Sequence, residues 1–237
     1  MKQIQRLNDI IAFNQHNPDI LAFIGLGSMD ETYRLDAYSD VDFFIIVNPS
    51  LKPILYNDVT WLNVSPIACW FQETMDGLKV VYEDGILLEF AIFTLDQLPH
   101  IEESGGRIYF LKEGISVEDV MVRKPNTITF NFEKTLNMLY AHCYIGMMRE
   151  RRGEHVAAHT MIQVYAAHEL CELCNPTVDD RFVVERRIEQ RLELDFSRLY
   201  PGIQHNQACV QFILETCKKH GWIHASMIRL IESLYTD

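Results

Sequence analysis

The chain changes character near Lys124-Pro125-Asn126-Thr127, and this change constrains its architecture more than any other feature. Before this point, short runs of β-branched and aromatic residues alternate with turn residues, a pattern typical of strands. After it, apolar residues recur three and four positions apart, a pattern typical of amphipathic helices. The sequence therefore predicts an α+β chain with two domains: residues 1–125 with a mixed β-sheet and flanking helices, and residues 126–237 with a bundle of helices.

The expected elements follow from the same patterns. Strands are predicted at Leu21–Gly25, Val41–Val47, Ile67–Phe71, Leu78–Tyr82, Ile86–Phe93 and Ile108–Leu111. The dipeptide Asp84-Gly85 predicts a tight hairpin between the fourth and fifth of these strands. A helix is expected before the first strand, because apolar residues at positions 4, 7, 10 and 11 recur at helical spacing. Further helices are predicted at Phe132–Arg151, His155–Leu173, Asp180–Leu194 and Gln207–His220.

The charge balance favours some partners over others. The chain has 21 Lys and Arg residues against 33 Asp and Glu residues, which gives a formal net charge of −12. A surface with this excess of negative charge repels the phosphate backbone of nucleic acids, so no nucleic-acid partner is expected. The same field favours cationic ligands or divalent metal ions.

Cysteine usage and hydropathy indicate a cytoplasmic protein. The six cysteines are scattered through the sequence, and the first residues lack the apolar stretch of a signal peptide. We therefore expect reduced thiols and a cytoplasmic location. No window approaches the roughly 18 consecutive apolar residues that a membrane-spanning helix needs, so no membrane partner is expected.

The residues most suggestive of chemistry follow the first two predicted strands. Gly27-Ser28 comes directly after the first strand, and small residues at such a position allow backbone amides to approach a phosphate group. Asp40 and Asp42 stand two residues apart at the start of the second strand. Because side chains alternate along a strand, both carboxylates are expected on one face. Such a pair of acids attracts a divalent cation, and Mg²⁺ prefers carboxylate oxygens together with waters and substrate phosphates.

A third acid, Glu89, lies within the apolar run 85–93. We expect it to be buried there and to need a partner, which a metal ion or an acceptor hydroxyl beside the two aspartates would supply. Taken alone, each of the three acids is more often a turn or capping residue. Together with Gly27-Ser28 they favour a metal site, because each acid interrupts an apolar pattern.

These motifs resemble those of the nucleotidyltransferase superfamily of DNA polymerase beta. The signature of that superfamily is Gly-Ser, a spacer, Asp-x-Asp or Asp-x-Glu, and a third acid on a nearby strand. Three segments also resemble lincosamide nucleotidyltransferases: Tyr38-Ser39-Asp40-Val41-Asp42-Phe43, Gly77-Leu78-Lys79-Val80-Val81-Tyr82 and Leu88-Glu89-Phe90. In the helical half, Arg152-Gly153-Glu154-His155 looks similar to a turn of the same antibiotic-modifying group.

The resemblance implies a nucleotidyltransferase fold and transfer of a nucleoside monophosphate from a Mg²⁺-bound triphosphate to a hydroxyl of a small molecule. ATP is the favoured donor, and a lincosamide-like or aminoglycoside-like compound is the implied acceptor. Asp40 and Asp42 would hold the metal ions, and Glu89 would act as a further metal ligand, as the general base, or as both. Gly27, Ser28, Ser39 and Arg34 are the implied nucleotide-binding residues. The helical domain would then form the acceptor wall, and a homodimer is possible within this family.

One departure from the family pattern leaves alternatives open. The family usually places a basic residue and a glycine within about five residues of Gly-Ser, whereas this chain has Met29-Asp30-Glu31-Thr32-Tyr33 and reaches Arg34 only later. Two acids near a triphosphate are unfavourable, so a non-catalytic or antitoxin-like protein with the same fold is one alternative. An enzyme that transfers nucleotides to a protein is another.

Overall fold

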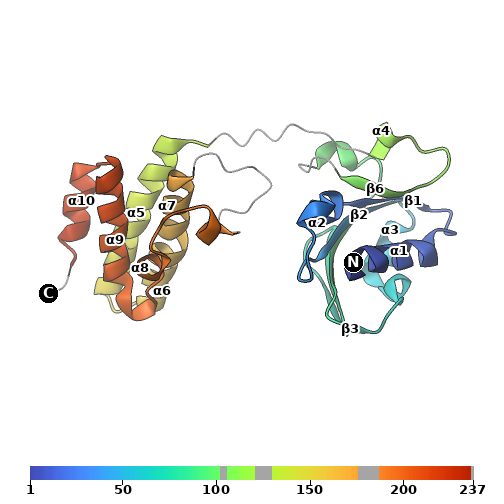
Figure 1. Ribbon diagram of the computed structural model, residues 1–237, viewed down its shortest axis with the longest axis horizontal. Helices are drawn as coiled ribbons and strands as arrows, with labels where there is room; N and C mark the ends of the chain where they lie inside the picture. Colours follow the sequence, from blue (N-terminus) through green and yellow to red (C-terminus); the bar gives the residue numbers. More distant parts are fainter. Residues whose placement is uncertain (102–105, 121–129, 176–186, 236–237) are drawn as a thin grey trace. The chain divides into compact units, whose positions relative to one another are not determined.

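The computed structural model describes residues 1–101, 106–120, 130–175 and 187–235. The chain divides into two compact units, Met1–Thr127 and Ile128–Asp237 (Figure 1). The sequence predicted the division between residues 125 and 126. A mixed sheet with flanking helices forms the first unit and helices form the second, so the predicted α+β class is confirmed.

The first unit is built on a six-stranded sheet with the order β3-β4-β5-β2-β1-β6. Its strands are β1 Ile20–Gly25, β2 Val41–Val47, β3 Ile67–Gln72, β4 Gly77–Tyr82, β5 Leu87–Phe93 and β6 Arg107–Leu111. Strands β2 and β5 pair in parallel, and the other described pairings are antiparallel. All six predicted strands are present. The predicted hairpin is also confirmed, because β4 and β5 pair through a turn at Gly85, whose φ of 84° suits glycine.

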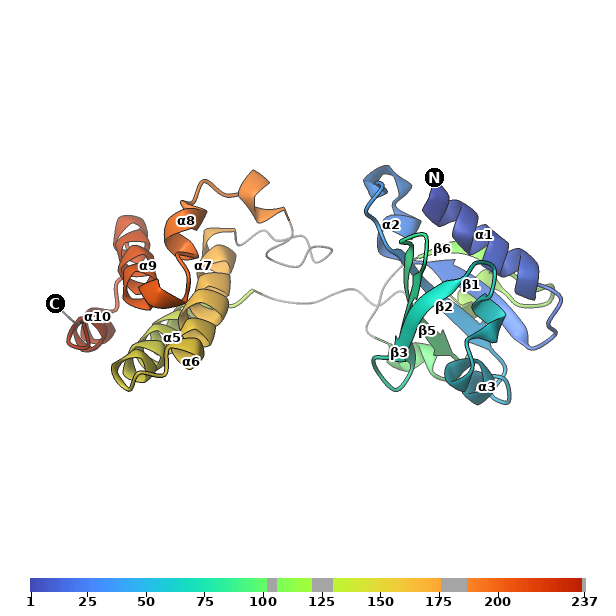
Figure 2. The ribbon, with the colours of Figure 1, turned by 90° about the horizontal axis from the view of Figure 1, so that it is seen from below.

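Apolar side chains cover one face of this sheet and part of the other. On one face, the helix α1 (Lys2–Asn14) packs Leu7 and Ile10 against the strands, together with the short helices α3 (Lys52–Asn57) and η2 (Thr60–Leu62). Figure 2 shows α1 lying along this face. On the other face, a smaller core forms around Ile24, Ile46 and Phe93, with η3 (Leu98–His100) and α4 (Val117–Val120) contributing Leu98 and Val120.

The two central strands alternate strictly between these faces. In β2, Val41, Phe43, Ile45 and Val47 belong to the larger core. The residues between them point to the other face, where Ile46 is core and Asp42 is half-buried. The smaller core therefore covers only one end of its face. The other end of that face, at the start of β2, stays open.

The second unit packs helices of very different lengths around its own core. They are α5 Phe132–Arg151, α6 His155–His159, the π-helix η4 Thr160–Ala166, α7 Ala167–Cys174, η5 Ile188–Gln190, α8 Phe196–Leu199, η6 Ile203–His205, α9 Asn206–His220 and α10 Ala225–Glu232. Asn131 caps α5 by accepting a hydrogen bond from the amide of Lys134, and Gly221 ends α9 in the left-handed region. Helix α5 packs against η4 so closely that a Cβ atom on Gly146 would lie 2.3 Å from Ile162 Cγ1.

The predicted helix at Asp180–Leu194 is wrong in its described part. Residues 180–186 lie outside the described residues, and within 187–194 only Ile188–Gln190 forms a single turn of 3₁₀-helix. Arg187 has a φ of 57°, a conformation that a continuing right-handed helix does not contain. The predicted helix at His155–Leu173 is present, but its middle is the π-helical segment η4, and α10 was not predicted.

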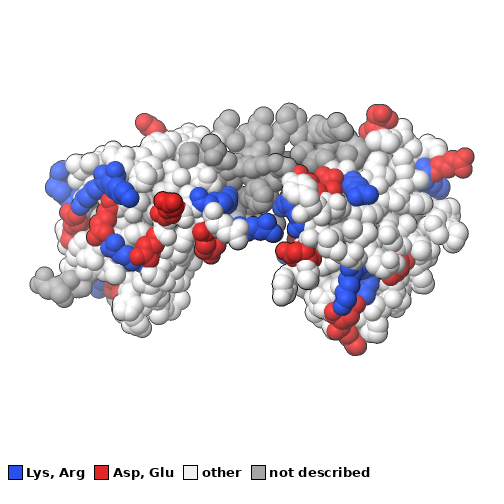
Figure 3. Space-filling model, viewed as in Figure 1, with Lys and Arg blue, Asp and Glu red and all other residues white. Residues whose placement is uncertain are grey.

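Within the part of the chain that the structure describes, no helix combines the length and the apolar character needed to cross a membrane. On the face drawn in Figure 3, acidic and basic side chains are interspersed on both units.

Candidate active site

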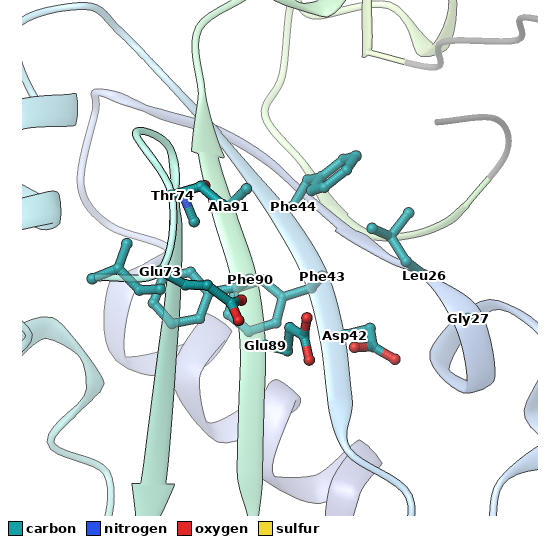
Figure 4. A pocket seen from close by; sticks show the side chains of 12 residues that line it. Leu26, Gly27, Asp42, Phe43, Phe44, Glu73, Thr74, Glu89, Phe90 and Ala91 are labelled. Atoms are coloured by element: carbon teal, nitrogen blue, oxygen red, sulfur yellow. The ribbon is translucent and has the colours of Figure 1, made fainter. Parts of the chain in front are cut away.

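Three carboxylates meet at the open end of the sheet. Asp42 and Glu89 lie opposite one another in the parallel pairing of β2 and β5, and Asp40 comes just before β2. One carboxylate oxygen from each of the three residues lies within 4.8 Å of the other two. Figure 4 shows the side chains of Asp42 and Glu89 projecting to the same side of the sheet. The structure thus brings together the three acids that the sequence singled out.

The surroundings of Glu89 differ from the prediction. The sequence placed Glu89 in a buried apolar run, but its side chain is 44% exposed. Its neighbours Leu88 and Phe90 are buried because they point to the opposite face. The run 86–93 therefore alternates like a half-exposed strand, and its apolar character at Ala91 reflects the smaller core farther along the same face. Its partial exposure removes the burial penalty that the prediction invoked.

Gly27 lies against the carboxylate of Asp42. The amide of Leu26 donates a hydrogen bond to the carbonyl of Asp42 at 2.9 Å, which fixes the end of β1 beside the start of β2. Gly27 then adopts a φ of 51°, and a Cβ atom built on it would lie 3.0 Å from Asp42 Oδ2. Glycine satisfies both the left-handed backbone and the close approach. A larger residue would displace the carboxylate that the site depends on.

Ser28 follows in the short helix α2 (Gly27–Asp30). Its hydroxyl Oγ is shielded from solvent and has no hydrogen-bond partner in the described part of the chain. The next residue, Met29, is fully buried, and its carbonyl accepts a hydrogen bond from the hydroxyl of Tyr109 at 2.8 Å. This anchoring holds the turn that carries Gly27 and Ser28 in place. An unpaired buried hydroxyl is a donor that a bound oxyanion can satisfy.

The two other candidate nucleotide-binding residues make local contacts. Arg34 donates from Nη1 to Glu31 Oε2 at 2.9 Å, and it is not among the residues that line the cavity described below. The hydroxyl of Ser39 accepts a hydrogen bond from the amide of Asp36 and lies 3.2 Å from Asp36 Oδ1. Ser39 and Asp40 both line a second cavity of about 550 Å³ beside the start of α1.

Sequence reasoning missed two charged residues at the site, Glu73 and Lys79. Lys79 lies on β4 opposite Glu89, and its Nζ is 2.8 Å from Glu73 Oε1 and 3.4 Å from Glu89 Oε2. The hydrogen bond to Glu73, with the charge of Glu89 adding to it, raises the pKa of Lys79. A signal was available in the sequence. Because Leu78 and Val80 are apolar, strand alternation places Lys79 on the same face as the acids.

A cavity of about 360 Å³ opens beside the acids. Asp42, Glu73 and Glu89 contribute carboxylates to its lining, and Phe44 and Ala91 contribute apolar surface (Figure 4). Thr74, from the turn between β3 and β4, and Gly77, the first residue of β4, also contribute to its lining. Hydrogen bonds hold this turn in place. Lys52 Nζ donates to Asp76 Oδ1 and to Gln97 Oε1, and the hydroxyl of Thr94 also donates to Gln97 Oε1.

The donor set fits a hard divalent cation. Oxygen atoms from three half-buried carboxylates are the ligands that Mg²⁺ takes, and their partial exposure leaves room for waters and substrate phosphates. Unbound, three carboxylates this close repel one another. In the described residues this is the one such group of acids, histidines or cysteines.

No protein-family model and no curated protein matches the sequence. Among solved structures, the chain is similar to an aminoglycoside 6-adenyltransferase from Bacillus subtilis, with 12% identity, a TM-score of 0.34 and coverage of 97% of both chains. It is also similar to a nucleotidyltransferase-like protein from Exiguobacterium sibiricum 255-15, with 14% identity and a TM-score of 0.33. That alignment covers 97% of this chain and 74% of the other.

Proposed function

We propose that this chain is a metal-dependent nucleotidyltransferase, which moves a nucleoside monophosphate from a nucleoside triphosphate to a hydroxyl of a small molecule. The observation that carries the proposal is the meeting of Asp40, Asp42 and Glu89 within 4.8 Å, next to the Gly27-Ser28 turn. Phosphoryl-group chemistry needs little covalent participation from a protein, because most of the catalysis is positioning and charge stabilisation. The cluster of carboxylate oxygens would supply the charge stabilisation by holding a metal ion, and the backbone turn beside it would position the triphosphate.

Each residue then has a defined task. Asp40 and Asp42 hold Mg²⁺, which when bound neutralises charge on the triphosphate. Ser28 donates its unpaired hydroxyl to a phosphate oxygen, and Gly27 lets the backbone approach that phosphate without a side chain in between. Ser39 and Arg34 are proposed to contact the nucleotide more peripherally, for which Arg34 would have to exchange its contact with Glu31.

Glu89 accepts the proton of the acceptor hydroxyl. The acceptor oxygen forms a bond to the α-phosphorus, the bond between the α-phosphorus and its bridging oxygen breaks, and pyrophosphate leaves with that oxygen. The proton passes from the hydroxyl to Glu89 and then to solvent, which the 44% exposure of the side chain allows. ATP is the donor we favour, and the resemblance in sequence suggests a lincosamide-like or aminoglycoside-like acceptor.

A non-catalytic relative with the same fold is the second candidate. The observation that favours it is the ion pair between Arg34 and Glu31, which holds a basic residue near the Gly-Ser turn on an acid of the same loop. A nucleotide-binding or partner-binding protein without transfer activity would tolerate this arrangement. Transfer to a protein acceptor is the remaining alternative.

Calorimetric titration separates these candidates. The purified chain is titrated with ATP, CTP, GTP and UTP, each with and without Mg²⁺, and Asp42→Asn is compared with Asp9→Asn, a matched loss of one exposed carboxylate on α1. Mg²⁺-dependent binding that Asp42→Asn abolishes and Asp9→Asn retains supports the proposal and names the donor base. Binding of no nucleotide at millimolar concentration contradicts it.

Incubation of the chain with nucleotides labelled at the α-phosphate then identifies the acceptor class. Label on an added lincosamide or aminoglycoside supports the small-molecule acceptor, whereas label on a macromolecule supports the protein acceptor. Mg²⁺-dependent nucleotide binding without any transfer supports the non-catalytic candidate.

A further inference from the structure

A cation stands next to the acids in the same row of the sheet. Lys79 on β4 is opposite Glu89 on β5, and Glu89 is opposite Asp42 on β2. The three residues therefore occupy one row across three adjacent strands, which are spaced about 4.8 Å apart. The row therefore consists of the two acids Asp42 and Glu89, followed by the cation Lys79 on the next strand.

Lys79 bridges two carboxylates. Its Nζ is 2.8 Å from Glu73 Oε1 and 3.4 Å from Glu89 Oε2. The ammonium therefore neutralises part of the charge of Glu89 and occupies one of its two oxygens. Because Glu73 remains beside the ammonium, Glu89 can turn an oxygen toward a metal ion without leaving Lys79 as an unpaired charge.

We propose that Lys79 is a built-in counter-ion of the acidic site, which keeps its affinity for a free divalent cation low and makes tight metal binding depend on the nucleoside triphosphate. The triphosphate brings several negative charges and oxygen ligands, which outweigh the repulsion between Lys79 and the metal ion. Lys79 is thus a positioning residue that acts through Glu89. This role rests on the proposed nucleotidyltransferase function.

A cross-strand pair that only stabilised the sheet would behave differently. Its removal would lower the melting temperature and leave the affinity for metal unchanged. A counter-ion, in contrast, acts on any divalent cation that binds the acids. Metal binding without nucleotide therefore separates the two roles.

The test measures Mn²⁺ binding to the full chain by electron paramagnetic resonance, without nucleotide and with a non-hydrolysable ATP analogue. We expect Lys79→Met to lower the Kd for Mn²⁺ alone about tenfold, the scale of a Coulomb interaction between charges a few ångströms apart in a water-like dielectric. Lys79→Arg keeps the charge and should bind as the wild type does. Glu73→Gln should weaken binding several-fold, because it leaves Glu89 as the partner of Lys79 and removes a nearby negative charge.

Lys112→Met is the matched control for net charge. Lys112 lies in the same unit, where Nζ bonds the carbonyl of Pro18 and its amide bonds Leu21 near the start of β1, away from the Gly27 turn. Its Kd for Mn²⁺ should equal that of the wild type. Unchanged or weaker Mn²⁺ binding in Lys79→Met, with analogue-dependent binding intact in the wild type, overturns the role of Lys79 alone. Failure of every variant to bind Mn²⁺ in either condition overturns the proposed function as well.

Discussion

Asp42 and Glu89 face one another across the parallel pair of β2 and β5, and the strands β3 and β4 separate them in the sequence. In a parallel pair the N-terminal ends of both strands lie at the same edge of the sheet, and Asp42 and Glu89 each lie near the N-terminal end of their strand. The placement of these two acids opposite one another therefore depends on the topology of the whole sheet rather than on a local turn.

Asp42→Asn should abolish Mg²⁺-dependent nucleotide binding while the chain stays folded. Asparagine keeps the shape of the side chain and removes the charge that a cation requires. Because Asp42 is half-exposed, we expect the melting temperature to change by no more than about 2 °C. Calorimetry and thermal denaturation check the two parts. Retained Mg²⁺-dependent binding in this variant would remove Asp42 from the metal site.

Gly27→Ala should damage both stability and the site. The left-handed backbone costs about 1 kcal/mol for alanine, and the new Cβ atom lies 3.0 Å from Asp42 Oδ2. Gly114→Ala is the matched control, because Gly114 has a φ of 89° and no atom within 4 Å of its Cβ position. Urea denaturation should show similar losses for both variants, whereas Mn²⁺ titration should show weakened binding for Gly27→Ala alone. Equal metal binding in the two variants would show that Gly27 has no bearing on the carboxylate.

Gly146→Ala should destabilise the helical unit by about 1–3 kcal/mol. The added methyl group would lie 2.3 Å from Ile162 Cγ1, in the contact between α5 and the π-helical segment. Ile162→Ala removes the clashing atoms, so the same glycine substitution should cost less in that background, with a coupling of about 0.5–3 kcal/mol. Unfolding free energies of the four proteins give this coupling. Additive losses would contradict the close contact.

The pairing of buried Glu169 with half-buried His142 predicts a pH dependence of stability. Burial raises the pKa of Glu169, although the hydrogen bond from His142 Nδ1 at 2.9 Å opposes the shift. Because the folded state binds the proton more tightly than the unfolded state, Glu169 contributes most to stability below its ordinary pKa, and this contribution is lost as the pH rises through the raised value.

Glu169→Gln removes this titration. The melting temperature of Glu169→Gln relative to the wild type should therefore rise from pH 4.5 toward neutrality. A difference between Glu169→Gln and the wild type that stays constant with pH would contradict the raised pKa.

The sequence predicted much of the first unit because its strands carry a simple pattern. Runs such as Val41–Val47 are apolar enough to be recognised, and Asp84-Gly85 has the chemistry that a tight turn requires. The acids could be selected because they interrupt these runs. Their proximity follows from the register of β2 and β5, which no local pattern encodes.

The predictions that were wrong or incomplete also depend on tertiary structure that no local pattern encodes. Glu89 was expected to be buried because Leu87 and Ala91 look like core residues, yet they lie on a face that is only partly covered. Residues 187–194 have helical periodicity, but tertiary packing overrides such a weak local preference. Glu73 lies on an exposed turn, so no burial pattern marks it as part of the site.

One face of the sheet serves as both core and cavity wall, and this sharing limits how the chain can be changed. Phe44 and Ala91 line the cavity and also pack against the smaller core, so substitutions there alter fold and binding together. Thr74 lines the same cavity from an exposed turn and belongs to neither core of the sheet. A library aimed at new acceptors should therefore vary Thr74 before Phe44 or Ala91, and should keep Glu73 and Asp76, which pair with Lys79 and Lys52. Natural divergence in substrate choice would likewise be less constrained by folding at Thr74 than at the two apolar residues.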